Sequence, residues 1–549
     1  MRRGITVAPI VVLLVLTSLL PGLSLAAVQD GVGPKVLRLN WGEFGPDTLD
    51  PQFSHEGQWS ISGGLDYEGL TRLDEELQVI PGAAESWEFS PDGTTITFHL
   101  RDGLRFSDGV PVTAAHFVYG AERLCSPELD SNSATLLFEV IGCEELFTSA
   151  GDTAAAEAAR AAFGVRALDE RTLEYRFERP APYFLVQASS WSAIPMRREL
   201  VEAGGAAWWT NPATRIGNGP YRLVEYTPNH RLFYARNDTY WGDRPKLEGI
   251  EWLFYVPGDD AIAAYRDGQV DAAWMLDRDV PALEADPILS RELVRIPDAG
   301  TSFFVFNVNR EPFTDTHVRA AFAYAFDRAA YCREVSYSSC TATLSMIPPG
   351  LPGSIETDAY AFDPAKARQA LADSSYGGPE NLPEVIWYGS KDSAGIDREG
   401  QWFYEQFRQV LGVELNLVYL SEEEFDALLD SPETWPQFEL STWFASTDPR
   451  GWLDQWRCDS EFTSLGYCNP KLDAVLVRAE AELDPEQRLA LYEEASHMLV
   501  DDVPAIFAYN LSLGWLVKPY VTGYTLSTAV NGNWPGWMDL LTIDVARPA

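Results

Sequence analysis

Cysteine is the residue type whose number and spacing most clearly suggest chemistry in this chain of 549 residues. Six cysteines fall into three neighbouring pairs, Cys125 with Cys143, Cys332 with Cys340, and Cys458 with Cys468. In an exported protein this pattern favours three local disulfides, although six cysteines allow other connectivities. A metal site is the alternative, but the sequence has no CxxC motif and its six histidines are scattered. We therefore expect disulfides, no metal and no cofactor.

Patterns that would indicate catalysis are missing. The sequence has no GxSxG, HExxH or Walker loop, and the cysteines are all assigned to disulfides. Pairs of carboxylates arise by chance among 81 acidic residues, so they are weak evidence for a hydrolase. The formal net charge of −40 argues against a nucleic-acid partner, because phosphate binding requires a basic surface. These features give little support to a secreted hydrolase.

The N-terminus has the layout of a signal peptide over residues 1–26. Arg2 and Arg3 precede an apolar run at 5–20, Pro21-Gly22 interrupts it, and small residues follow at 24–27. An uncleaved membrane anchor is the alternative, since the run is near the lower length limit for a span. No cysteine follows the run, which argues against a lipoprotein. We expect export to the periplasm or the extracellular face of the membrane.

The elements that must position any binding residues alternate between strands and helices, which predicts an α/β fold. Between residues 301 and 328, Phe303 to Phe306 predict a buried strand and Thr316 is the expected N-cap of a helix. Val318, Phe322 and Ala325 would share the buried face of that helix. Further along the chain we expect a hairpin around Asp92-Gly93, a helix capped by Thr113, and a loop at 205–215 with exposed Trp208 and Trp209. At this length two or three domains are expected.

The segment 301–328 resembles a strand-turn-helix of the family-5 extracellular solute-binding proteins, the oligopeptide- and dipeptide-binding receptors of ABC importers. More segments resemble that family in the same order: PGAAESW at 81–87, LRDG at 100–103, FSDG at 106–109, VTAAHFVY at 112–119, GNGPY at 217–221, RNDTYW at 236–241, DGQVD at 267–271 and FDPAKA at 362–367. The chain departs from the family at His116, where an aspartate is usual. Each motif is weak alone, but together they cover nearly the whole mature chain.

The resemblance implies an α/β fold of the type II periplasmic-binding-protein kind, with two hinged ligand-closing lobes and an extra inserted lobe. It implies that lobe I is built from residues 36–68, 214–298 and 517–549. Lobe II, the inserted one, would take 69–213, and lobe III would take 299–516. The partners implied are a peptide or similar small solute and the permease subunits, with the receptor itself a monomer.

The resemblance also implies where ligand would bind. In peptide receptors of the family, an aspartate in a gW.aD…dP motif pairs with the α-ammonium group of the peptide, because a buried cation needs an anionic partner. Counting from Phe438 without gaps places Asp448 at that position, whereas anchoring on Trp443 places Ser446 there. Asp448 could instead begin an Asp-Pro turn, and Trp443 could line the cleft or fill the core.

Two further segments are expected near ligand. His55 and Glu56 lie in a stretch, 53–57, that resembles the part of the family running along bound peptide, and it could offer an edge for backbone pairing. Alternatively, the segment 53–57 is an ordinary polar loop with no role in binding. The loop between Cys458 and Cys468 would brace the cleft wall. Three functions follow: a peptide receptor, the same receptor binding an oligosaccharide or other solute, and, least supported, a secreted hydrolase.

Overall fold

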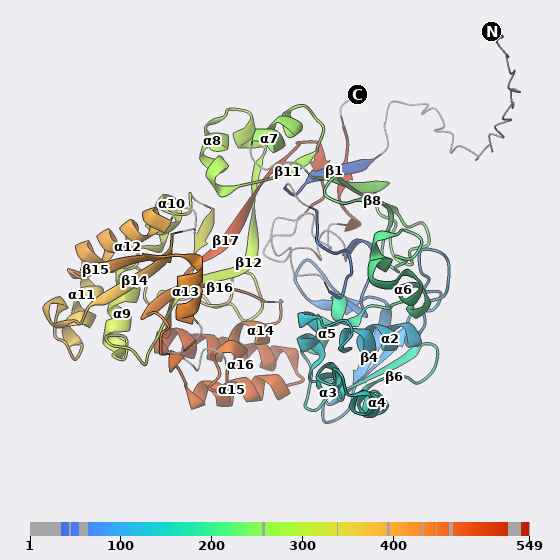
Figure 1. Cartoon of the computed structure of the whole chain (residues 1–549), viewed down its shortest axis with the longest axis horizontal. Helices are drawn as coiled ribbons and strands as arrows, with labels where there is room; N and C mark the ends of the chain where they lie inside the picture. The colour runs from blue at the N-terminus through green and yellow to red at the C-terminus, as the bar shows by residue number, and fades with distance from the viewer. Residues whose placement is uncertain are drawn as a thin grey trace, which may run out of the picture.

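The computed structural model describes residues 35–42, 45–53, 64–254, 259–337, 339–391, 396–429, 431, 433–445, 447–460, 465–524 and 540–547. The predicted signal peptide and the candidate residues His55, Glu56 and Ser446 lie outside these ranges. Within them, no helix has the length and apolar character needed to cross a bilayer. The chain forms three lobes, and Figure 1 shows the long strands β12 Leu293–Phe306 and β17 Ala505–Val517 running between two of them.

A nine-stranded sheet runs through two of the lobes. Its path is β16-β12-β17-β11-β1-β10-β9-β8, and β13 pairs with β17. The strands are β1 Val36–Asn40, β8 Tyr221–Thr227, β9 Arg231–Arg236, β10 Gly249–Leu253, β11 Ala272–Met275, β12 Leu293–Phe306, β13 Cys340–Ala342, β16 Phe438–Phe444 and β17 Ala505–Val517. β1 is parallel to β10 and β11, and the other pairs are antiparallel.

The first lobe contains β1 and β8 to β11. On one face of its sheet, α7 Asp259–Arg266 and α8 Val280–Ala285 enclose a small core around Tyr265 and Met275. On the other face, residues near the C-terminus, including β18 Val521–Thr522 and β19 Asp544–Val545, help to bury Leu37, Leu39 and Trp252. The first lobe is therefore completed by the last residues of the chain.

Asp271 ties the two ends of the described chain together in this lobe. Its carboxylate is fully buried and accepts hydrogen bonds from Arg38 Nη2 at 2.9 Å, from Arg547 Nη2 at 2.5 Å and from Tyr520 Oη at 2.9 Å. These hydrogen bonds outweigh the effect of burial and lower the pKa of Asp271.

The inserted lobe has its own sheet and its own core. The sheet has the order β4-β5-β7-β6, with β4 Ala84–Phe89, β5 Thr95–Leu100, β6 Val165–Ala167 and β7 Thr172–Arg176. Five helices accompany it, α2 Ala114–Leu124, α3 Cys143–Phe147, α4 Thr153–Ala162, α5 Phe184–Gln187 and α6 Arg198–Gly204. The core contains Phe98, Phe117 and Tyr175, and all its fully buried members lie between Leu70 and Ala193.

Two predictions for this lobe are confirmed and one is wrong. β4 and β5 form the expected hairpin around Asp92-Gly93, and Thr113 is the N-cap of α2. Trp208, which we expected to be exposed, is only 3% exposed, because its indole Nε1 donates to Asp50 at 3.1 Å in a buried site.

The third lobe packs helices on both sides of the far end of the large sheet. On one side are α9 Thr316–Ala325, α10 Arg328–Glu334, α11 Pro364–Asp373, α12 Ile396–Leu411 and α13 Glu422–Leu429, with the parallel pair β14 Val385–Ser390 and β15 Leu415–Leu420. On the other side are α14 Arg450–Leu453, α15 Pro470–Ala481 and α16 Pro485–Asp502. Figure 1 shows α14 to α16 below the sheet, next to the inserted lobe.

The predicted strand at Phe303 to Phe306 is the end of β12, a strand of 14 residues. β12 pairs with β17 in both lobes, but the register shifts between Pro297 and Thr301. Val318, Phe322 and Ala325 are buried as expected, whereas the N-cap of α9 is Asp315 and not Thr316. The Asp315 side chain accepts from the His317 N–H, so a stronger capping residue stands one position earlier.

All three expected disulfides are present, Cys125–Cys143, Cys332–Cys340 and Cys458–Cys468, and no free cysteine remains. A short hairpin of β2 Thr71–Leu73 and β3 Val79–Pro81 leads into the inserted lobe. Its Leu73 and Leu77 belong to the apolar core that contains Trp452 and Leu453 of the third lobe.

Candidate functional site

The strand β16 is an edge of the large sheet within the part of the chain that the structure describes. It pairs with β12 from Gly300↔Phe444 to Phe306↔Phe438, and no strand of the described residues pairs with its other side. An open edge presents backbone N–H and C=O groups to which an extended chain can bind. The strand ends at the crossover between lobes, so this edge meets the place where the lobes diverge.

Trp443 is a half-buried residue near the end of β16. Its indole Nε1 donates to the Gly451 carbonyl at 2.9 Å, and its ring packs against the core that contains Trp452. The bond connects the strand to the first turn of α14. The residue is only half-buried, so core packing describes its buried portion, and the lining of a cleft by Trp443 stays a prediction.

Asp448 is held by groups of its own lobe. Its two carboxylate oxygens accept from Arg488 Nη1 and Nη2, each at 2.8 Å, and Oδ1 also accepts from the Arg450 N–H at 2.9 Å. The side chains of Asp448 and Arg488 are 5% and 13% exposed. Burial alone would lower the pKa of Arg488, but the facing carboxylate raises it. This geometry joins the start of α14 to α16.

Glu439 is a residue that the sequence interpretation missed. It lies on β16 opposite Val305 of the core, four residues before Trp443, and alternation along a strand puts both side chains on one face. Burial raises the pKa of Glu439 to about 7. The period-two pattern of FELSTWF could have revealed it, because an acidic residue there falls on the same face as the tryptophan.

Both ends of the segment that carries His55 and Glu56 are anchored to the inserted lobe or its border. Before the segment, Arg123 Nη1 donates to Asp50 at 3.0 Å and to Gln52 at 2.9 Å, and Gln52 donates to the Gly120 carbonyl at 2.8 Å. After it, the fully buried pair Arg215 and Asp66 has contacts of 2.7 and 2.9 Å. Burial raises the pKa of Asp66 to about 6 despite this arginine.

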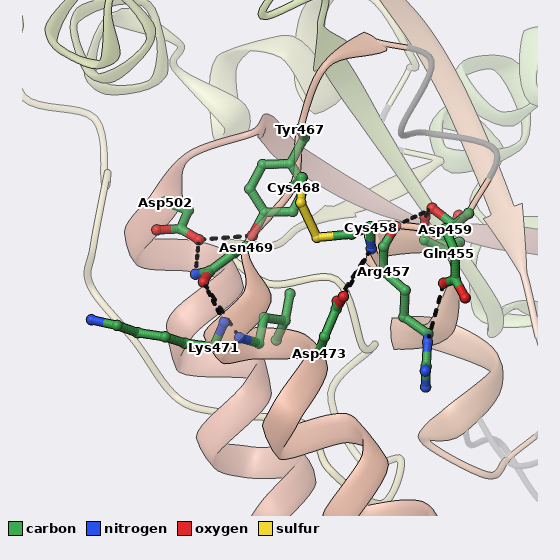
Figure 2. Close-up of a disulfide and its surroundings, with 12 residues drawn as sticks. Gln455, Arg457, Cys458, Asp459, Tyr467, Cys468, Asn469, Lys471, Asp473 and Asp502 are labelled. Atoms are coloured by element: carbon green, nitrogen blue, oxygen red, sulfur yellow. Dashed lines mark hydrogen bonds and ion pairs between the residues drawn. A yellow bond between two sulfur atoms is a disulfide. The ribbon is translucent and has the colours of Figure 1, made fainter.

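The disulfide Cys458–Cys468 braces the chain after α14 (Figure 2). The Cys458 N–H donates to Asp473 of α15 at 3.2 Å. On the other side of the bridge, Tyr467 Oη and Asn469 Nδ2 donate to Asp502 at the end of α16, at 2.7 and 2.6 Å. Figure 2 shows these bonds on either side of the sulfur atoms, so the bridge fixes the loop to both helices.

A family model described as "Bacterial extracellular solute-binding proteins, family 5 Middle" matches residues 78–464. The chain belongs to this family. Among curated family-5 relatives, the dipeptide-binding protein DppE of Bacillus subtilis is 29% identical, over 89% of each chain. A protein of Escherichia coli named as the probable deoxycholate-binding periplasmic protein YgiS is 30% identical, over 88% of this chain and 89% of its own.

Solved structures share the fold. The open, unliganded form of MppA, a periplasmic murein tripeptide binding protein, has a TM-score of 0.80 at 24% identity and covers 94% of this chain and 98% of its own. The OppA of Haemophilus influenzae in complex with the peptide RPPGFSPFR has a TM-score of 0.65 at 24% identity, over 94% of this chain and 99% of its own. The family-5 chain therefore has the type II periplasmic-binding-protein fold with hinged lobes and an inserted lobe.

Proposed function

We propose that this family-5 protein is the substrate-binding receptor of an ABC importer, and that it captures peptides between its lobes and delivers them to a membrane permease. The observation that carries the proposal is the open edge of β16 beside the lobe crossover. An extended peptide that paired with this edge would be bound through its backbone, which permits many side chains. The names of the relatives DppE and OppA support peptide as the ligand class.

Capture would proceed by hinge closure at the crossover. β12 and β17 run through both lobes, and the shift in their register near Gly300 separates two well-paired sections. Such an irregular point between rigid sections can absorb the change in backbone angles when lobes close. The higher TM-score with the form of MppA titled open and unliganded, 0.80 against 0.67 for a second MppA structure, supports an open arrangement. The lobe boundaries at residues 68, 213, 298 and 516, which the family resemblance implies, are part of this proposal.

Within this proposal, Asp448 has a structural role, and the alignment anchored on Trp443 assigns Ser446 to the position that would face the peptide N-terminus. The support is the bidentate ion pair that occupies both oxygens of Asp448. A serine hydroxyl is a weaker partner than a carboxylate for an ammonium group, because it carries no charge. Trp443, His55 and Glu56 would complete the ligand surface.

The ion pair that occupies both oxygens of Asp448 also favours a second candidate, a receptor for a solute without an ammonium group. The relative YgiS, named for deoxycholate, is as similar in sequence to this chain as the peptide receptors are. Both candidates are exported binding proteins that work as monomers with permease subunits, and neither is an enzyme.

The test is calorimetric titration of the mature protein with trialanine, N-acetyl-trialanine, deoxycholate and maltotriose. We expect both peptides to bind, with little loss on acetylation, and to raise the melting temperature by mass action. Binding of deoxycholate or maltotriose without either peptide would replace the peptide proposal with the second candidate. Turnover of any of the four compounds would contradict a pure receptor.

A further inference from the structure

A cluster of charged side chains connects the inserted lobe to the third lobe just after the end of β16. Its centre is Arg450, the first residue of α14. From the inserted lobe, Glu139 bonds to Arg450 Nη2, and the Arg450 guanidinium lies 4.1 Å from the centre of the Tyr183 ring. Tyr183 also donates to Glu139. One cation is thus held by an anion and an aromatic ring of the other lobe.

The third lobe holds the same guanidinium from the opposite side. Arg450 Nε lies 2.8 Å from Asp454 Oδ2 and 3.4 Å from Glu480 Oε1. Without Arg450, the carboxylates of the two lobes would face each other with less compensation, and like charges repel. The side chains of Arg450 and Glu139 are only 17% and 18% exposed, so solvent screens this contact less than a surface pair.

Two more cations and an apolar contact extend the patch. Arg179 of the inserted lobe bridges Glu139 at 2.7 Å and Glu480 at 3.9 Å, and Arg457 lies 3.1 Å from Glu480. Leu483, in the turn between α15 and α16, packs over Gly93 of the β4–β5 hairpin. Three arginines and three carboxylates therefore meet at this contact, and the pairs Arg450–Glu139 and Arg179–Glu480 cross between the lobes.

The inserted lobe is fixed to the first lobe, so this patch joins two bodies that are also linked at the crossover. The contact of Arg123 Nη1 with Asp50, at 3.0 Å, and the hydrogen bond from Ser107 N–H to the Gly217 carbonyl, at 2.9 Å, connect the inserted lobe to the first. The third lobe meets this combined body at β12 and β17, and again through the Arg450 patch together with the β2–β3 hairpin, whose Leu73 and Leu77 share a core with Trp452. A rigid rotation that preserves two separate contacts must have its axis through both.

We propose that the Arg450 cluster is the second pivot of the hinge, and that Arg450 is a positioning residue that sets the axis about which the third lobe closes. Arg450 is also two residues from Asp448, which binds the Arg450 N–H, and α14 is bonded to Trp443. The pivot therefore adjoins the end of β16. This inference rests on the hinged fold and not on the identity of the ligand.

The test measures distances between lobes by double electron–electron resonance in the ligand-free protein. Spin labels at the exposed Leu168 of the inserted lobe and Val477 of α15 report on the arrangement of the two lobes, and the native cysteines are all in disulfides. Glu139→Gln keeps the shape of the side chain but removes the negative charge that pairs with Arg450 of the third lobe. Its matched control is Glu122→Gln, since Glu122 also binds two arginines, Arg198 at 3.1 Å and Arg160 at 3.2 Å, but within one lobe.

We expect Glu139→Gln to broaden the distribution of distances between the labels by at least half, and Glu122→Gln to leave it unchanged. Arg450→Met should broaden it further, and urea unfolding of each variant shows whether it is folded. An unchanged distribution in folded Glu139→Gln, or equal broadening in Glu122→Gln, would overturn the pivot. Because the test uses the ligand-free protein, failure of trialanine to bind bears only on the proposed ligand and not on the pivot.

Discussion

Replacement of Asp448 by asparagine separates its two possible roles. Asparagine has nearly the same size, so the change removes one charge without creating a cavity. The partner, Arg488, would keep its charge in a site where its side chain is only 13% exposed. Breaking a buried ion pair by removing one partner costs about 3–5 kcal/mol, because the remaining charge is uncompensated. The asparagine side chain keeps one acceptor oxygen, so we expect a loss at the lower end of this range, about 3 kcal/mol.

The control is Asp238→Asn in the turn that follows β9. Asp238 and Arg244 are in contact at 3.2 Å, but their side chains are 72% and 69% exposed. Exposed pairs contribute at most about 1 kcal/mol, so the free energy of unfolding should hardly change. Urea titration followed by tryptophan fluorescence measures both variants at pH 7.

Ligand binding supplies the decisive comparison. If Asp448 is structural, Asp448→Asn should change the affinities for trialanine and N-acetyl-trialanine by the same factor. A loss of tenfold or more for trialanine alone, with the unfolding free energy intact, would refute the structural role. It would return Asp448 to the ammonium-binding position that the gapless alignment gives it.

Three other changes test the fold around the site. His116 Nδ1 accepts the Thr113 N–H at 3.0 Å, and burial lowers the pKa of His116. The stability that this cap contributes is therefore present above the usual histidine pKa of about 6.5 and is lost as the pH falls. His116→Asp should reduce the loss of stability to urea between pH 7 and pH 5, and an unchanged dependence on pH would contradict this. A Cβ at Gly300 would lie 2.5 Å from the Phe444 ring, so Gly300→Ala should lower the melting temperature, and the second change Phe444→Ala should restore part of it; no rescue would exclude the clash. Replacing Cys125 and Cys143 with alanine should cost the inserted lobe about 3 kcal/mol in urea unfolding, whereas a loss below about 1 kcal/mol would show that its buried core suffices.

Local features of the fold were predictable from the sequence because their causes are local. The capping threonine of α2, the hairpin at Asp92-Gly93 and the three disulfides each depend on residues close together in the chain. The histidine at position 116 also has a local explanation, because its ring nitrogen accepts the hydrogen bond from the Thr113 N–H that an aspartate oxygen would usually accept.

Features that depend on distant partners were not predictable. Trp208 follows a short run of glycine and alanine, and the carboxylate of Asp50, far back in the chain, makes a buried indole favourable there. The role of Asp448 depends on Arg488, forty residues later, and a helix sequence does not show which acidic group its arginine will meet. The same holds for Arg450 and Glu139.

The construction of the first lobe sets an order for folding. Strand β1 needs β10 and β11 as neighbours, β11 needs β17, and the full set of hydrogen bonds to Asp271 forms only when Arg547 arrives. A chain that emerges N-terminus first therefore leaves β1 without its full sheet until nearly all residues have been made. The inserted lobe draws its core from one continuous stretch and can close its disulfide early. Truncation of even the last few residues should consequently harm the part of the receptor that was synthesised first.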